Sequence, residues 1–162
     1  MSVRVYFAFG VRHRIQQAAL TAAKNYRSAK KILVYSSEQK RLDGFSRMLW
    51  DVAPTAFVPH EQVESAAHLA QLIHEDWGHE QQPAPVLLVQ DSSLLAASEL
   101  AAIAEEVWLL NLDLACPPHY AQFACVLEIV SEHEQDKQYA RNRWKHYRND
   151  GANLIAHQMT SN

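Results

Sequence analysis

Residues 137–148, KQYARNRWKHYR, combine five Lys or Arg residues with three aromatic residues and contain no acid. A helix over this segment would place Lys137, Arg141, Trp144 and Arg148 on one face, in a stripe about 60° wide. Guanidinium and ammonium groups bind carboxylates, and an indole supplies an apolar contact. The stripe therefore predicts a groove for an acidic, partly hydrophobic ligand. The alternative is a solvated helix face, because basic residues suit the dipole near a helix C-terminus.

Three further residues of this segment have expected positions relative to the stripe. Ala140 and Tyr147 lie just beside it and are expected to anchor the helix against the core. Arg143 lies about 100° from the stripe and is expected not to contact the ligand. It would then serve as a control position for binding measurements.

A second candidate binding segment is LDGFSRMLWDVAPTAFVPH, residues 42–60. Trp50, Phe57, Val58 and Pro59 are large apolar residues around an expected helix end and a short extended segment. Trp50 falls on the expected inward stripe of the helix, so it can be a core residue. The alternative is an apolar docking patch, because grouped apolar residues at a surface mark sites of protein interaction. The sequence leaves both interpretations open.

Sequence patterns of common nucleotide and phosphoryl sites are absent. A dinucleotide site needs several glycines in the first strand–helix turn. The corresponding turn, FGVRHR at residues 9–14, has one glycine, and the whole chain has four. The P-loop pattern GxxxxGK[ST] does not occur. A receiver-type phosphoacceptor needs acidic residues after its first strand, but the first acid is Glu38.

Nine histidines and two cysteines could supply metal ligands or nucleophiles, but their spacing disfavours both roles. His68, His74 and His79 do not match HExxH or another zinc pattern. Cys116 near His119 is better explained as a small buried apolar residue. We therefore expect no catalytic residue, no metal and no cofactor, and we expect that the chain is not itself an enzyme.

Apolar segments alternate with amphipathic ones along the chain, which is typical of α/β proteins. Strands are expected at residues 3–9, 31–36, 85–90 and 106–112, with a short extended piece at 55–60. Helices are expected at residues 14–27, 38–51, 62–77, 94–104, 119–130 and 134–149. This order predicts one domain over residues 1–162, a three-layer sandwich with a mainly parallel twisted sheet and helices on both faces. Residues 78–85 are expected to be a surface loop and residues 155–162 a C-terminal tail.

Charge is segregated along a chain whose formal net charge is −3 and whose sequence pI is about 6.3. Seven basic residues and no acid precede Glu38, whereas residues 48–136 hold fifteen acids and no Lys or Arg. The net charge disfavours a general nucleic-acid-binding protein. The segregation allows a local positive site for a negative partner. No apolar run approaches the ~20 residues of a membrane helix, and no signal peptide is expected, so we expect a cytoplasmic protein.

Taken together, the two candidate binding segments resemble the chi subunit family of bacterial DNA polymerase III. The residues of the first segment that carry the resemblance are Leu42, Asp43, Leu49, Trp50, Pro54, Phe57, Val58, Pro59 and His60. Those of the second are Lys137, Arg141, Arg143, Trp144, Lys145, Tyr147, Arg148, Gly151, Asn153 and Leu154. Both motifs occur in the family's order, and the order of elements resembles the family over most of the chain.

The resemblance implies a non-catalytic accessory subunit with an α/β fold and two protein partners. The first partner is the psi subunit, held on the clamp loader, which would contact Trp50, Phe57, Val58 and Pro59. The second is the C-terminal tail of single-stranded-DNA-binding protein, which is acidic and ends in Phe. DNA and the clamp loader itself would be reached indirectly, through these partners.

The resemblance also implies roles for the residues that would bind the acidic tail. Lys137 and Arg141 would meet its acidic side chains and terminal carboxylate. Val130 and Trp144 would border the pocket for its Phe ring, and Arg148 would be an outer contact.

Two other classes of function remain open. The chain could be a direct single-stranded nucleic-acid-binding module that uses its basic aromatic C-terminal helix. It could also be an enzyme with a degenerate nucleotide site. The acidic middle of the chain disfavours the first, and the missing glycines disfavour the second. Binding measurements with bare single-stranded DNA and with an acidic peptide ending in Phe distinguish an adaptor from a DNA-binding module.

Overall fold

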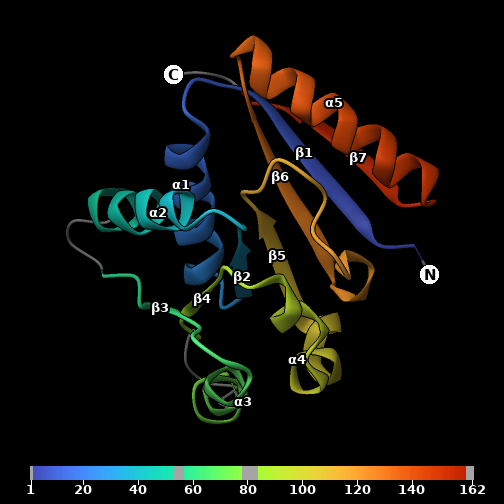
Figure 1. Ribbon diagram of the computed structural model, residues 1–162. Helices are drawn as coiled ribbons and strands as arrows, with labels where there is room; N and C mark the ends of the chain where they lie inside the picture. The colour runs from blue at the N-terminus through green and yellow to red at the C-terminus, as the bar shows by residue number, and fades with distance from the viewer. Residues whose placement is uncertain (1, 53–56, 78–83, 160–162) are drawn as a thin grey trace.

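Seven parallel strands form one sheet in the order β3-β4-β2-β5-β6-β1-β7 in the computed structural model, which describes residues 2–52, 57–77 and 84–159 (Figure 1). The strands are β1 (Arg4–Val11), β2 (Lys31–Tyr35), β3 (His60–Gln62), β4 (Val86–Val89), β5 (Val107–Asn111), β6 (Cys125–Ser131) and β7 (Asn153–Gln158). The α-helices are α1 (Arg14–Arg27), α2 (Gln39–Val52), α3 (Ala66–Glu75), α4 (Ser98–Ile103) and α5 (Glu134–Asn149). Short 3-10 helices are η1 (Ser92–Ala96), η2 (Ala104–Glu106) and η3 (Tyr120–Gln122).

The central strands read as continuous apolar runs because helices cover both faces of the sheet. All four residues of β4 are buried, and so are all seven residues of β6. Parallel sheets are typically covered in this way, since the connections between their strands place helices on the faces. The expected α/β architecture with a parallel sheet is therefore confirmed.

Two hydrophobic cores separate the three layers. Helices α1 and α2 cover one face, and α3, α4 and α5 cover the other. Four buried alanines, Ala18, Ala19, Ala22 and Ala23, let α1 approach the sheet closely. The buried residues of α2 are Leu42, Phe45 and Leu49. Figure 1 shows α5 lying along β1 and β7 at one side of the sheet.

The helix expected at residues 119–130 is wrong. Residues 125–131 form β6, which pairs with β5 on one side and β1 on the other. Leu127 and Val130 fit a helical spacing, but they belong to different cores on opposite faces of the sheet. A 13-residue connection that contains η3 and no α-helix joins β5 to β6. The sequence did contain an indication of this strand. The apolar run CVLEIV, residues 125–130, is consistent with a buried strand as well as with a helix.

Three other segments differ from expectation. The single helix expected at residues 94–104 is divided into η1, α4 and η2. The helix expected at residues 62–77 begins only at Ala66, where the Ser65 hydroxyl accepts a hydrogen bond from the His68 amide. Leu69 and Leu72 are its buried residues. Residues 155–158 are part of β7, so this part of the expected tail is an edge strand that pairs with β1. Within the expected loop at 78–85, residues 78–83 lie outside the described residues.

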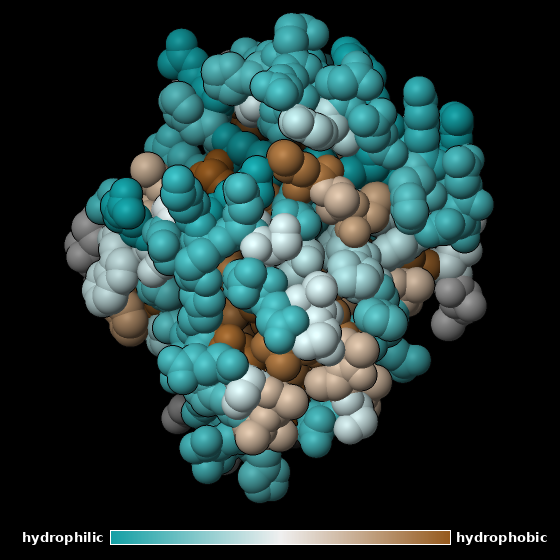
Figure 2. All heavy atoms as spheres, viewed as in Figure 1, coloured by the Kyte–Doolittle hydropathy of each residue, from teal (hydrophilic) through white to brown (hydrophobic). Residues whose placement is uncertain are grey.

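In the part of the chain that the structure describes, no helix has the length and apolar character needed to cross a membrane. The visible face of the molecule is mostly hydrophilic, and hydrophobic residues appear there in small separate groups (Figure 2).

Candidate functional site

A cavity of about 780 Å³ lies between α5 and the carboxyl-terminal ends of β1, β6 and β7. All five residues predicted to bind an acidic tail line it, namely Val130, Lys137, Arg141, Trp144 and Arg148. Nine further residues line it and were not predicted as site residues: Phe7, Phe9, Gly10, Ser131, Glu132, Ala140, Lys145, Ala156 and Gln158. The fold thus brings the predicted set together and adds a wall from β1 and β7. We call this space the α5 cavity.

Basic side chains form the outer side of the α5 cavity. Arg141 is exposed and donates a hydrogen bond from Nη1 to Oε1 of Gln138 at 3.3 Å. The Lys137 ammonium lies 3.7 Å from the Glu134 carboxylate, and its side chain is 41% exposed. Among the described residues, no ion pair involves Arg141, Lys145 or Arg148. These charges are therefore available to an anionic ligand.

The floor of the α5 cavity is apolar. Trp144 is half-buried, and its indole meets the Phe7 ring edge-on with ring centroids 5.0 Å apart. Phe9 is 37% exposed, and it pairs in register with Val130 of the neighbouring strand. The contact of Trp144 with Phe7 depends on the pairing of β1 with β6 and β7, which the sequence does not specify. The sequence contains one indication of this wall: Phe7 and Phe9 are two positions apart in an expected strand, which places both side chains on the same face of the sheet.

The glycine at position 10 shapes the end of this wall. Gly10 has φ of +82°, a conformation that favours glycine, and the register between β1 and β6 shifts there. A Cβ at this position would meet the carbonyl oxygen of Met159 at 3.4 Å. The turn therefore lets the chain after β7 pass close to the rim of the α5 cavity.

Arg143 is buried, so it cannot serve as the control position for binding that its place off the stripe predicted. Its side chain is 1% exposed, and its Nε donates a hydrogen bond to Oε1 of Glu128 at 3.1 Å. Its Nη1 donates to the carbonyl oxygen of Leu114 at 3.0 Å. The reason is the helical spacing: Ala140, Arg143 and Tyr147 form the inward face of α5, and all three are buried.

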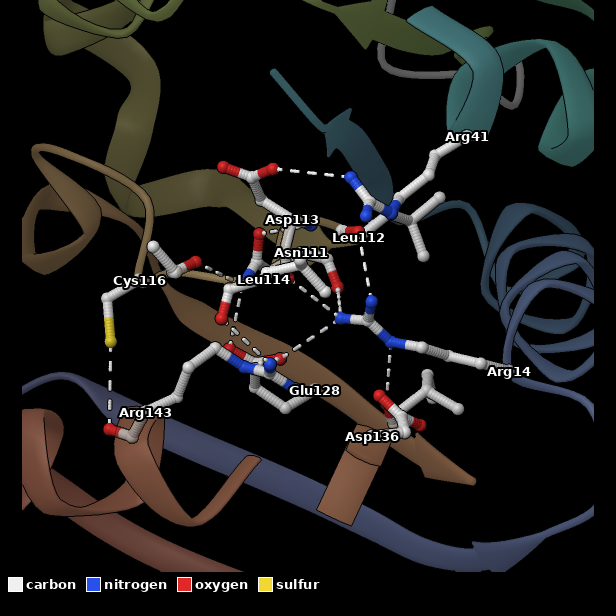
Figure 3. Close-up of polar contacts among 12 residues, drawn as sticks. Arg14, Arg41, Asn111, Leu112, Asp113, Leu114, Cys116, Glu128, Asp136 and Arg143 are labelled. Atoms are coloured by element: carbon white, nitrogen blue, oxygen red, sulfur yellow. Dashed lines mark hydrogen bonds and ion pairs between the residues drawn. The ribbon is translucent and has the colours of Figure 1, made fainter. Parts of the chain in front are cut away.

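Glu128 is the centre of a buried polar cluster beneath α5 (Figure 3). The Tyr147 hydroxyl donates to its Oε2 at 2.7 Å, and the Asn111 amide donates to the same oxygen at 2.9 Å. Because the carboxylate is fully buried, these donors and Arg143 offset the cost of removing its charge from water. The cluster joins α5 to β5 and β6, and so it positions the cavity-lining residues of the helix.

Arg14, the first residue of α1, contacts the ends of β5 and β6 from the sheet face opposite to α5. Its guanidinium donates to the carbonyl oxygens of Ile129, Leu112, Asp113 and Asn111 at 2.9, 3.0, 3.0 and 3.3 Å. Burial lowers the pKa of Arg14, and the charge of Arg143 acts in the same direction. The four carbonyl contacts connect the ends of β5 and β6 to the start of α1. No sequence pattern indicates this role, because the acceptors are backbone atoms that only the fold brings together.

The cysteines and histidines form no metal or nucleophilic site in the described part of the chain. Groups of three or more His, Cys, Asp or Glu residues that could hold a metal ion are not found there. Burial raises the pKa of Cys116 to about 12 and that of Cys125 to about 12. Both thiols therefore remain protonated at neutral pH, when they are weak nucleophiles.

An exposed aromatic pair lies at the far end of α2. Trp50 is 59% exposed and Phe57 is 56% exposed, with ring centroids 4.6 Å apart. The core interpretation of Trp50 is therefore wrong. Val58 is buried, and Pro59 is half-buried, so the predicted apolar set is divided between surface and core. Nearby, the two ring nitrogens of His60 contact the Ser46 hydroxyl at 2.8 Å and the carbonyl oxygen of Val58 at 2.9 Å.

The fold and these two surfaces define an α/β protein with a cation-lined cavity on one side and an exposed aromatic pair on another. The model of the DNA polymerase III chi subunit family, HolC, matches residues 1–155, and the chain belongs to this family. It is similar to the DNA polymerase III subunit chi of Pseudomonas aeruginosa strain PAO1, with 25% identity over 146 residues that cover 90% of this chain and 87% of that protein. The family resemblance predicted from the two sequence motifs is confirmed, and the chain is an accessory replication subunit of DNA polymerase III.

One solved structure that aligns with the chain is a de novo designed protein with a P-loop NTPase fold. The two are 17% identical, and the alignment covers 98% of this chain and 85% of the designed protein. Its TM-score of 0.31 is too low to support an argument about fold or function.

Proposed function

We propose that this chain is a non-catalytic adaptor that binds the psi subunit and the acidic C-terminal tail of single-stranded-DNA-binding protein. It would thereby connect the clamp-loader complex of DNA polymerase III to coated single-stranded DNA. Family membership supports the replication role. The observation that carries the tail-binding part is the α5 cavity, which combines accessible cations with an apolar floor.

The chemistry of the α5 cavity is complementary to an acidic peptide that ends in Phe. Arg141, Lys137 and Arg148 would bind its carboxylates, with charge-assisted hydrogen bonds from the guanidinium groups. The Phe ring would be buried against Val130 and Trp144, where an aromatic anchor removes apolar surface from water. A polyanion without an aromatic end would bind the cations but would leave the apolar floor uncovered.

The Trp50–Phe57 pair is the proposed contact with psi. Two large aromatic rings that are more than half exposed and contact each other at a tilt of 35° form an apolar surface of the kind that marks protein interaction sites. His60 bonds to Ser46 of α2 and to the Val58 carbonyl, and so it holds the segment after Phe57 against the helix. In this proposal Trp50 and Phe57 contact psi directly, Pro59 lies at the edge, and Val58 supports them from the core.

A peptide titration tests the tail-binding proposal. Arg141→Ala should weaken binding of an acidic peptide ending in Phe by about 1.5–3 kcal/mol, the scale of a hydrogen bond to a charged group. Added salt should weaken wild-type binding, because exposed charge pairs are screened. Trp144→Ala should also weaken binding, but with little change in the salt dependence, because it removes an apolar contact.

Lys40→Ala is the matched control, since Lys40 is an exposed cation on α2, away from the α5 cavity. It should leave peptide affinity unchanged. Equal losses for Arg141→Ala and Lys40→Ala would mean that the peptide responds to overall charge, and the specific cavity would have to be abandoned.

A further inference from the structure

Six of the seven basic residues that precede Glu38 fall into two groups, those with partners in the fold and those without. Arg14 is buried in carbonyl contacts, and Lys31 pairs with Glu106 at 3.2 Å. A second group, made of exposed cations near the amino-terminal ends of β1 and β5 and the end of α1, comprises Arg4, Lys24, Arg27 and Lys30. Among the described residues none of these four forms an ion pair. The proposed partners use none of them.

Two of these cations lie over aromatic rings on the face of the sheet that α1 partly covers. The Arg4 guanidinium is 6.0 Å from the centroid of the Tyr6 ring, and the Lys30 ammonium is 5.1 Å from the centroid of the Trp108 ring. Both aromatic residues are half-buried and pack against the core beneath α1. Arg4 and Trp108 each pair in register with Cys125, so the two cation–aromatic pairs are separated by one strand.

A cavity of about 370 Å³ continues this surface along α1 toward β7. Its lining includes Tyr6, Leu20, Lys24 and His157. Of the described residues that line it, one is acidic, Glu128, and that carboxylate is bound by Arg143 and Tyr147 on the α5 side of the sheet. The lining of the hollow therefore combines a cation and an aromatic ring without an exposed carboxylate, and the exposed carboxylate near Trp108, Glu106, is paired with Lys31. We call this face of the sheet the α1 surface.

We propose that the α1 surface binds single-stranded nucleic acid. A single strand carries its negative charge on the backbone and exposes flat bases. Grooves that bind it combine cations for the phosphates with aromatic side chains on which bases stack. Lys24, Lys30 and Arg4 would bind phosphates, and Tyr6 would offer a ring for stacking beside the hollow. Arginine adds a second planar group, because guanidinium ions stack on aromatic faces.

This surface is separate from the α5 cavity. Alternate residues of a strand point to opposite faces, so Tyr6 faces α1 whereas Phe7 faces α5. Nucleic-acid binding at the α1 surface does not depend on peptide binding at the α5 cavity. An experiment can therefore disprove either proposal without affecting the other. The α5 cavity has one apolar floor for a single terminal ring, whereas the α1 surface has two separate rings, each with its own cation, which matches the repeated phosphates and bases of a single strand.

The test is a titration of the full chain against a fluorescently labelled oligothymidylate at several salt concentrations. Lys24→Glu/Lys30→Glu should weaken binding by about tenfold or more at low salt. It should also reduce the slope of log affinity against log salt by about 0.7 for each phosphate that the protein no longer neutralises. Lys40→Glu/Arg47→Glu makes the same change in net charge with exposed residues of α2, and it should leave the affinity nearly unchanged. The acidic peptide titration, run in parallel, should be insensitive to Lys24→Glu/Lys30→Glu and sensitive to Arg141→Ala.

Four results would overturn the inference. Wild-type protein could fail to bind the oligonucleotide at low salt, or both double variants could lose affinity equally. Arg141→Ala could abolish DNA binding while Lys24→Glu/Lys30→Glu does not, which would move the site to α5. Finally, polyglutamate of equal charge, or an abasic oligonucleotide of equal length, could bind as tightly as oligothymidylate. The surface would then recognise an acidic protein or any polyanion, and the aromatic rings would have no role.

Discussion

Arg143 and Arg141 are two positions apart on α5 and have opposite environments, which makes their substitution a sharp comparison. Arg143→Ala removes the closer of the two guanidinium groups from the buried Glu128 carboxylate and leaves Arg14 at 3.9 Å, so it should lower the free energy of unfolding by about 3 kcal/mol. Arg141→Ala removes an exposed side chain and should change it by less than about 0.5 kcal/mol. Urea unfolding of both variants measures the difference. Similar stabilities would show that the buried pair does not hold α5 in place.

At Phe57 and Val58, neighbouring apolar residues are expected to respond differently to truncation. Phe57→Ala should weaken psi binding by about 2 kcal/mol or more, as for an aromatic anchor of an interface. Because its ring is 56% exposed, stability should fall by far less than the about 3–5 kcal/mol of a core Phe truncation.

Val58→Ala is the matched comparison for Phe57→Ala. Val58 is 3% exposed, so its truncation should lower the free energy of unfolding by about 1–2 kcal/mol. It should weaken psi binding only to the extent that it unfolds the protein. Calorimetric titration with psi and thermal unfolding together separate the two effects. A collapse of stability in Phe57→Ala would make Phe57 a core residue, and the interface would have to lie elsewhere.

At the scale of elements, the edge strand β7 completes both the sheet and the α5 cavity. It pairs with β1 from Arg4 to Phe9, and Leu154 packs against the core beneath α5. A chain that ends after Ala152 should therefore lose several kcal/mol of stability, because six strand pairs and apolar burial are removed. It should also lose affinity for the acidic peptide, since Ala156 and Gln158 line the cavity.

A chain that ends after Met159 keeps all of β7 and the backbone hydrogen bond from Met159 to Phe9, so it should match the full chain in both measurements. Thermal unfolding and peptide titration of the two truncated chains check this. If the shorter chain were as stable as the longer one, β7 would add no stability, and residues 155–158 would behave as part of the tail that the sequence predicted.

At the scale of the whole molecule, several buried groups make stability sensitive to alkaline pH in the same direction. Burial raises the pKa of Cys116 and Cys125 to about 12, and it also raises the pKa of Tyr35, Tyr120 and Tyr147. In the unfolded chain thiols titrate near pH 8.5 and tyrosines near pH 10. As the pH rises, these groups lose their protons in the unfolded state before they do so in the folded state. Their contribution to the free energy of unfolding is therefore fully present below about pH 8.5 and decreases above it.

The free energy of unfolding should therefore fall by roughly 2 kcal/mol or more between pH 7.5 and 10. Urea unfolding at several pH values measures the decline. Cys125→Ala removes one of the groups, so its curve should be shallower between about pH 8.5 and 10 than that of the wild type. A wild-type stability that stays constant to pH 10 would contradict the raised thiol pKa values.

The α/β fold class followed from the alternation of strand and helix patterns, because periods of 2 and 3.6 residues are local properties of the chain. Residues 119–130 show where local patterns fail. Tyr120, Phe123, Leu127 and Val130 match a helical face, yet the segment contains η3 and part of β6. Since β6 lies in the middle of the sheet, its residues are apolar on both faces, and that pattern does not specify a period.

The sequence by itself determined the family, the basic aromatic stripe of α5 and the aromatic residues near position 57, because these depend on residue type and short spacing. Tertiary structure decided which of those side chains are available. It buried Arg143 against Glu128, exposed Trp50, and gave the stripe a floor from Phe7 and Phe9. The physical reason is that burial and pairing of a side chain depend on neighbours from distant strands, and the chain's own periodicity carries no information about which strands become neighbours.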